Sequence, residues 1–196
     1  LPEPFRAELT ALWNAWLARG FLDDESIRLM WREKATPPGE SPLSPGARWH
    51  PDAQPGNEVE VESATPGEVR LNVKPGGDGV RWRSAAYLDQ LRFVDDATYT
   101  LTFAARADAV RTAEVTMSRD EPGWRTDKWR TRGLRTTIAL KPEWQEFRFA
   151  FVTHSIVDVA SRLSILAGHQ PGEIWVKNLR LESGSATAGL RPGQSA

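Results

Sequence analysis

Residues 96–107 read DATYTLTFAARA and carry the clearest sign of the fold class. From Tyr99 to Ala105 every second residue is apolar, with threonine or alanine between them. A period of two places the apolar residues on one face of a β-strand and the others on the opposite face. An apolar face needs a second layer to cover it, so the stretch predicts a half-buried strand in a layered β structure.

The same alternation recurs along most of the chain after residue 58. It is found at residues 58–62, 69–73, 113–117, 147–151, 163–167 and 174–176. Turn-forming sequences, such as PGGDG at 75–79, separate the runs. Eight or so short, half-apolar strands at this spacing predict an all-β fold, an antiparallel β-sandwich of the jelly-roll kind. In the last run the apolar phase slips between Val176 and Leu179, which predicts a bulge at Lys177-Asn178.

The chain divides into four predicted regions. Residues 1–35 carry apolar side chains at helical spacing and predict a short helical hairpin, whose apolar stripe needs a partner surface. Residues 36–57 contain six prolines and predict a linker. Residues 58–182 form the predicted sandwich, and residues 183–196, rich in Ser, Gly and Ala, predict a flexible tail.

Composition excludes several classes of function. Lys and Arg (25) nearly equal Asp and Glu (26), a net charge of −1 that argues against a nucleic-acid partner. The chain has no Cys, which excludes disulfides, thiolate metal sites and cysteine nucleophiles. No apolar run reaches the roughly 18–20 residues of a membrane span, so we expect no membrane partner.

Three segments together resemble bacterial carbohydrate-binding modules of the family four, nine and twenty-two type. They are residues 96–107, the sequence WQEFRF at 144–149, and the sequence GEIWVKNLRL at 172–181. The resemblance implies a jelly-roll β-sandwich that binds a polysaccharide or oligosaccharide. It also implies a structural calcium that an Asp of the last strand helps to bind, but Lys177 stands at that position. An ammonium group cannot ligate a hard cation, so the sequence does not support that calcium site, and no other cofactor is expected.

Residues 13–17 and 27–31 resemble a helical segment found beside or within the catalytic barrels of some bacterial glycoside hydrolases. This second resemblance implies that the chain is an accessory part of a larger hydrolase, with the neighbouring catalytic domain as a partner. It further implies a location outside the cell or in the cell envelope.

Nine Trp against two Tyr point to an aromatic-rich core or to flat ligand platforms. Sugars are held by aromatic faces together with planar hydrogen-bonding side chains, usually in a cleft. The candidate carbohydrate-binding residues are Trp82, Gln90, Glu114, Trp124, Trp129, Arg130 and Arg148. Trp124 and Trp129 have an alternative role as a plug beneath a long loop, and Glu114 and Arg148 lie on strands whose polar faces line a cleft or merely meet solvent. Trp144 is expected in the core, while Trp175 has no preferred side.

No residues form a catalytic constellation, so we expect no enzymatic activity in this chain. Glycoside chemistry needs two carboxylates held at a fixed separation, and no motif selects such a pair. The three His are isolated, without metal-ligand spacing or a nearby Ser–Asp set. The sequence therefore predicts a non-catalytic module that stacks sugar rings on Trp. Two alternatives stay open: a docking domain of the hydrolase that binds no sugar, and a binder of acidic polymers through the basic loop at 119–135.

Overall fold

The computed structural model describes residues 8–12, 41–120, 131–156 and 160–184. The chain divides into two units, residues 1–34 and 35–196. In the first unit residues 8–12 are helical, and the rest of the predicted hairpin lies outside the described residues. Among the helical residues described, none belongs to a segment long and apolar enough to cross a membrane.

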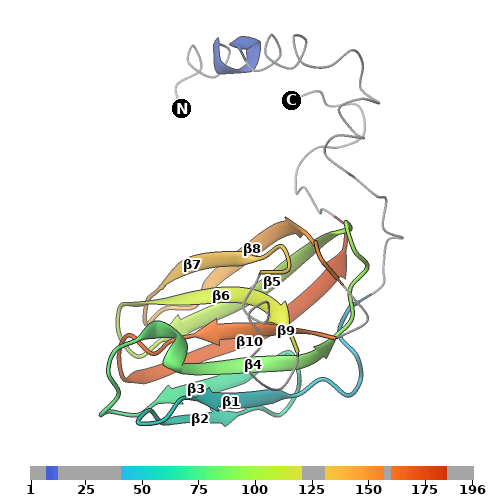
Figure 1. Cartoon of the computed structure of the whole chain (residues 1–196). Coiled ribbons are helices and arrows are strands. Elements are labelled where there is room, and N and C mark those ends of the chain that lie inside the picture. Colours follow the sequence, from blue (N-terminus) through green and yellow to red (C-terminus); the bar gives the residue numbers. More distant parts are fainter. Residues whose placement is uncertain (1–7, 13–40, 121–130, 157–159, 185–196) are drawn as a thin grey trace. The chain divides into compact units, whose positions relative to one another are not determined.

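The second unit is a sandwich of two five-stranded antiparallel sheets, which confirms the predicted fold class (Figure 1). One sheet has the order β1-β4-β9-β6-β7, and the other has the order β2-β3-β10-β5-β8. The elements are β1 (Trp49–Ala53), β2 (Val59–Glu62), β3 (Val69–Val73), the 3-10 turn η1 (Arg81–Arg83), β4 (Ser84–Leu91), β5 (Thr98–Ala107), β6 (Arg111–Arg119), β7 (Arg135–Leu140), β8 (Gln145–Val152), β9 (Ser161–Leu166) and β10 (Gly172–Ser183).

The core lies between the sheets and is built by the apolar positions of the alternating runs. Leu101 and Phe103 of β5 are almost fully buried, and the Phe103 ring stacks on Phe147 of β8 with centroids 5.3 Å apart. From the other sheet, Val115 of β6 and Leu163 of β9 are each 1% exposed. Because the inward positions are fixed by this packing, the alternate residues of each strand are fixed on the outer faces.

The bulge predicted at Lys177-Asn178 is confirmed. The pairing of β10 with β5 shifts register between Lys177 and Arg180, and Asn178 has φ +54°. The extra residue changes the phase of the strand, as a β-bulge does. Leu179 and Leu181 are therefore buried after the bulge, just as Val176 is before it.

The boundary between linker and sandwich was predicted too late in the sequence. Residues 36–57 were assigned to a linker, but β1 within this range pairs with β4, where His50 faces Tyr87 and Pro51 faces Ala86. β1 is an edge strand, and an edge is where a sheet tolerates a proline. The prolines predicted a break in regular structure. β1 nevertheless accommodates Pro51 because this strand lies at the edge of its sheet.

Gly133 should be the least replaceable of the turn glycines. Its φ is +114°, and an added Cβ would lie 2.0 Å from the carbonyl oxygen of Val152. Gly76 is a matched control, since its φ is +104° but nothing lies within 4 Å of an added Cβ. We expect Gly76→Ala to lower the free energy of unfolding by about 1–2 kcal/mol through backbone strain alone. Gly133→Ala should lower the free energy of unfolding by a further ~1–3 kcal/mol, because the added Cβ meets the Val152 carbonyl. Urea unfolding measures both variants, and an equal loss of stability in the two would contradict this packing.

Candidate functional site

The outer face of the β1-β4-β9-β6-β7 sheet is hollowed along its centre. The strand register places His50, Tyr87, Ser164, Thr116 and Arg135 in one row across the five strands. The central strands β9 and β6 carry small side chains in this row, whereas the flanking strands carry large ones. A sheet face with short side chains at its centre and long ones at its sides forms a groove.

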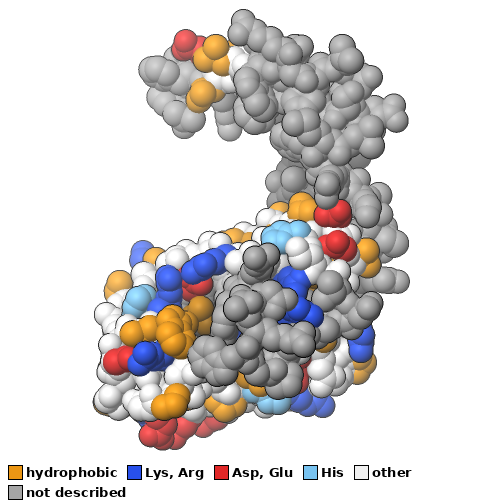
Figure 2. All heavy atoms as spheres, viewed as in Figure 1, with side chains coloured by type: hydrophobic (Ala, Val, Ile, Leu, Met, Phe, Trp, Pro, Cys, Tyr) orange, Lys and Arg blue, Asp and Glu red, His pale blue; other side chains and the backbone are white. Residues whose placement is uncertain are grey.

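A pocket of about 320 Å³ lies in this groove. It is lined by Trp82, Glu114, Thr116, Ser118, Arg135, Ser164 and Leu166. Trp82 belongs to η1, directly before β4, and its side chain is 43% exposed. Figure 2 shows hydrophobic side chains gathered over η1, with Lys or Arg side chains beside them. The pocket therefore combines an accessible indole with hydroxyl groups, a carboxylate and a guanidinium group.

Glu114 is held between two arginines at the pocket. Its side chain is only 5% exposed, its Oε2 lies 3.0 Å from Nη1 of Arg81, and its Oε1 accepts a hydrogen bond from Nε of Arg135 at 3.0 Å. A buried carboxylate is tolerated when charged donors satisfy both of its oxygens. Arg81 directly precedes Trp82 in η1, so its ion pair with β6 also ties the indole-bearing turn to the sheet.

Beside the pocket, Tyr87 forms a second aromatic group on the same face. Its ring stacks on His50 with centroids 5.1 Å apart, and the guanidinium of Arg162 lies 4.7 Å from its centroid. Arg162 is fixed in turn by Asp52, 3.3 Å away. Burial raises the pKa of the Tyr87 hydroxyl above its ordinary value of 10.0, so the phenol is neutral and able to donate a hydrogen bond at physiological pH.

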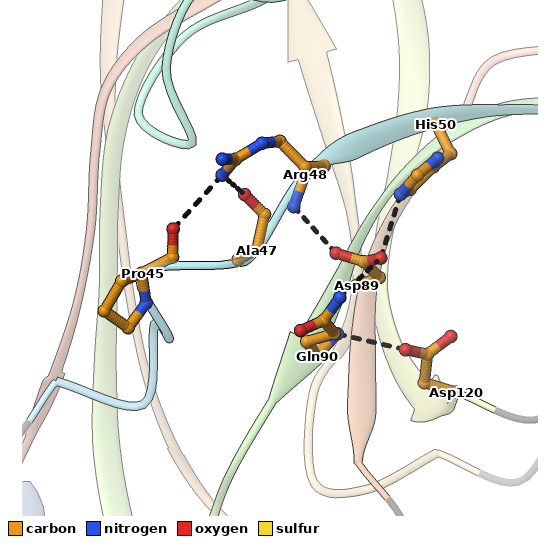
Figure 3. A network of polar contacts seen from close by, with 7 residues as sticks. All are labelled: Pro45, Ala47, Arg48, His50, Asp89, Gln90 and Asp120. Carbon is orange, nitrogen blue, oxygen red and sulfur yellow. Dashed lines mark hydrogen bonds and ion pairs between the residues drawn. The ribbon is translucent and has the colours of Figure 1, made fainter.

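Gln90 lies at an irregularity of β4, next to Asp89 and facing Asp120 (Figure 3). It is not among the residues that line the pocket. The pairing of β4 with β9 shifts register between Leu88 and Leu91, and Gln90 has φ +55°. Its backbone N–H donates to Oδ2 of Asp120 at 3.0 Å. The neighbouring Asp89 accepts a hydrogen bond from the backbone N–H of Arg48 at 2.7 Å and contacts His50 Nε2 at 2.9 Å. In this arrangement the backbone of Gln90 helps to join β4 to the end of β6.

The structure brings together only part of the predicted set. Trp82 and Glu114 line one pocket. Arg148 lies on the outer face of β8, in the other sheet, and so on the opposite side of the sandwich from this pocket. A single cleft containing both Glu114 and Arg148 is therefore ruled out, because the two strands belong to different layers. Trp124, Trp129 and Arg130 lie outside the described residues.

Two groups of residues were missed or misplaced by sequence reasoning. Ser164 lines the pocket but was not proposed for a site, and Arg135 was considered only as part of the basic loop at 119–135. The signal was present for Ser164, which alternates with the inward-facing Leu163 and Ile165 of β9 and so lies on the outer face of the sheet, where it is 3% exposed. Trp144 was expected in the core, and this was wrong: its side chain is 42% exposed, because it precedes β8 rather than occupying an inward position of that strand.

The position of Lys177 does not fit a calcium ion. Its Nζ lies 4.1 Å from the centroid of the Trp144 ring, so a fixed cation already stands there. In residues 8–12, 41–120, 131–156 and 160–184, no three His, Asp or Glu side chains are grouped so that they could hold a metal ion.

Comparisons with known proteins agree with this fold. The sequence model of a family described as carbohydrate binding domain matches residues 45–166. A structure described as CBM4 superposes with a TM-score of 0.55 at 19% identity, covering 69% of this chain and 86% of that one. The N-terminal cellulose-binding domain of β-1,4-glucanase C from Cellulomonas fimi gives a TM-score of 0.52 at 17% identity, covering 77% and 99%. No curated protein matches the sequence.

The Glu114 arrangement makes a prediction for stability. Glu114→Gln keeps the shape of the side chain but leaves two guanidinium groups beside a neutral amide, so we expect the free energy of unfolding to fall by about 1–3 kcal/mol. Arg135→Gln removes a side chain that is 58% exposed and leaves Glu114 paired with Arg81, so its cost should be about 0–1 kcal/mol. Urea unfolding of both variants measures the difference, and a larger loss for Arg135→Gln would contradict it.

Proposed function

Because the chain belongs to the carbohydrate-binding domain family, we propose that the groove on the outer face of the β1-β4-β9-β6-β7 sheet holds a polysaccharide or oligosaccharide without altering it. The observation that carries this proposal is the pocket in which an exposed Trp82 stands beside a fixed carboxylate and three hydroxyl side chains. Sugar rings present an apolar face and a rim of hydroxyl groups, and this pocket offers a partner for each.

The two parts of the pocket have separate roles. The indole of Trp82 stacks on the apolar face of one sugar ring. Ser164 can donate and accept hydrogen bonds. The Thr116 hydroxyl donates to the Leu134 carbonyl and is left to accept, whereas Ser118 Oγ accepts from Nε of Arg162 and is left to donate. Glu114 accepts hydrogen bonds and Arg135 donates them. Since Glu114 partly neutralises its two arginines, the pocket is suited to hydroxyl groups rather than to a highly charged ligand. Glu114 and its two arginines already hold one another in place before a ligand binds, so little entropy is lost in ordering them on binding.

The wider setting of the module is part of the same proposal. Carbohydrate binding without catalysis is useful when it keeps an enzyme near an insoluble or dilute polymer, because tethering raises the effective concentration. We therefore assign the chain to an accessory role in a glycoside hydrolase that works outside the cell or in the cell envelope. This assignment is supported by the similarity of residues 13–17 and 27–31 to hydrolase segments.

Trp82→Ala tests the proposed mode of binding. Loss of the stacking surface should lower the affinity for a bound glycan by about 30-fold or more, the effect of removing a central aromatic contact. Affinity electrophoresis against neutral plant and microbial polysaccharides identifies the glycan, and calorimetry measures the change. Trp82→Phe should retain part of the affinity.

Val110→Ala provides the matched control, since Val110 is an exposed apolar residue, 72% accessible, in the turn between β5 and β6. It should bind as the unchanged chain does. Unaltered binding by a folded Trp82→Ala variant would remove Trp82 from the site.

A docking role is the second candidate function, and one observation favours it. In the helical residues 8–12, Leu9 and Leu12 are 52% and 62% exposed, which leaves apolar surface for a neighbouring domain. Removal of residues 1–34 distinguishes the two functions, because these residues form a separate unit. If the sandwich itself binds glycan, the shortened chain should migrate in affinity gels as the full chain does, at low and at high salt. Loss of retardation in a folded shortened chain would favour docking.

A further inference from the structure

The outer face of the β2-β3-β10-β5-β8 sheet carries a second group of aromatic and charged side chains. The register pairs Glu62 with Arg70, Arg70 with Trp175, and Trp175 with Arg106. Ala105 faces Gln145 across β5 and β8, which places Trp144 next to Arg106. Acidic, basic and aromatic side chains thus form one row across five strands, a width of about 19 Å.

The two indoles of this row are fixed by cations. The guanidinium of Arg106 lies 4.2 Å from the centroid of Trp175 and 5.3 Å from that of Trp144. Nζ of Lys177 lies 4.1 Å from the Trp144 centroid. Contacts at these distances are attractive and hold a flat ring in place. Trp144 is therefore an ordered surface group although it is 42% exposed.

Trp144 stays accessible although two cations contact its ring. Both cations project from β5 and β10, which lie on the same side of β8 within the sheet. β8 is the edge strand, so no strand of the described sheet stands on the other side of Trp144. The side of Trp144 toward the sheet edge therefore has no neighbouring strand to cover it, and the residue is 42% exposed.

An open groove of about 600 Å³ runs from this indole toward β2 and β3. Its lining includes Glu62, Glu68, Arg70, Trp144, Trp175 and Lys177. Two carboxylates and two cations face it, so the groove offers both hydrogen-bond acceptors and donors and its formal charges cancel. Glu62 is already neutralised by Arg70, 3.1 Å away.

We propose that this groove is a second saccharide-binding site, in which Trp144 stacks on a neutral sugar ring while Lys177 and Glu68 contact its hydroxyl groups. An exposed and immobilised indole beside balanced donors and acceptors matches the apolar face and hydroxyl rim of a neutral pyranose. A highly charged ligand is disfavoured by the equal numbers of carboxylates and cations. The groove is open, so it accepts an internal segment of a polymer as well as a chain end.

The second site lies on the opposite outer face from the Trp82 pocket, with the core between them. One ligand residue therefore cannot occupy both sites. The two sites instead allow a single chain to hold two polymer strands, which raises its retention on a polymer through multivalency.

Competing with this proposal is a purely structural role, in which the cations and indoles only stabilise the outer face of the sheet. The test uses the full chain and its variants Trp82→Ala, Trp144→Ala and the double variant. Binding to hydroxyethylcellulose, xylan, mixed-linkage β-glucan and galactomannan is measured by affinity electrophoresis and calorimetry, and folding by thermal unfolding. Indole N–H signals, followed by NMR during titration, report which Trp meets the sugar.

For at least one of these glycans, Trp82→Ala should leave residual binding that the double variant loses, and the Trp144 indole signal should shift on titration. Trp144→Ala alone should lower the affinity about 10-fold or more, and Trp144→Phe should recover part of it. Lys177→Met should weaken binding while the variant stays folded. Because Trp82→Ala and Trp144→Ala are measured separately, an absence of binding at one site is distinguishable from an absence of binding at the other.

Two results would overturn the proposal. One is a folded Trp144→Ala variant that binds every glycan as the unchanged chain does, because the indole then serves the sheet alone. The other is an unshifted Trp144 indole signal at glycan concentrations that saturate the chain. Glu146→Gln is the control, since Glu146 is an exposed residue of β8, two positions after Trp144, and does not line the groove.

Discussion

The alternation of inward and outward side chains along each strand is the constraint on which the rest of this structure depends. Packing of Leu101, Phe103 and Val115 between the sheets sets the register, and a slip by one residue would exchange the two faces of a strand. The same packing therefore decides that Glu114 and Trp175 point outward. Both surfaces with a proposed role in sugar binding are consequences of how the core is filled.

Charge stabilises aromatic groups on both faces, but in different ways. On one face the buried Glu114 holds Arg81, and through it the turn that carries Trp82. On the other face Arg106 and Lys177 contact the Trp144 ring directly. In each case an indole that is more than two fifths exposed is held by an interaction rooted in a strand. A side chain that is ordered before a ligand arrives loses little entropy on binding, which favours affinity.

The bulge in β10 links the fold to one of these surfaces. By adding a residue after Lys177, it lets Leu179 and Leu181 return to the core while Trp175 and Lys177 stay on the outer face. Without the bulge, Leu179 and Leu181 would lie on the outer face of the sheet. A local irregularity thus keeps a long strand amphipathic along its whole length, as bulges do in other sheets.

From local periodicity alone the sequence predicts the layered β fold, the strands β2, β3, β5, β6, β8, β9 and β10, and the β10 bulge. β4 and β7 were not among the predicted runs. The sequence also indicated Trp82 and Glu114 as candidate site residues, and both line the pocket. Only the tertiary structure decided that Glu114 and Arg148 lie on different sheets, that Pro51 belongs to an edge strand, and that Trp144 is exposed. These depend on which strands become neighbours, and strand order is set by long-range packing that a period of two does not encode.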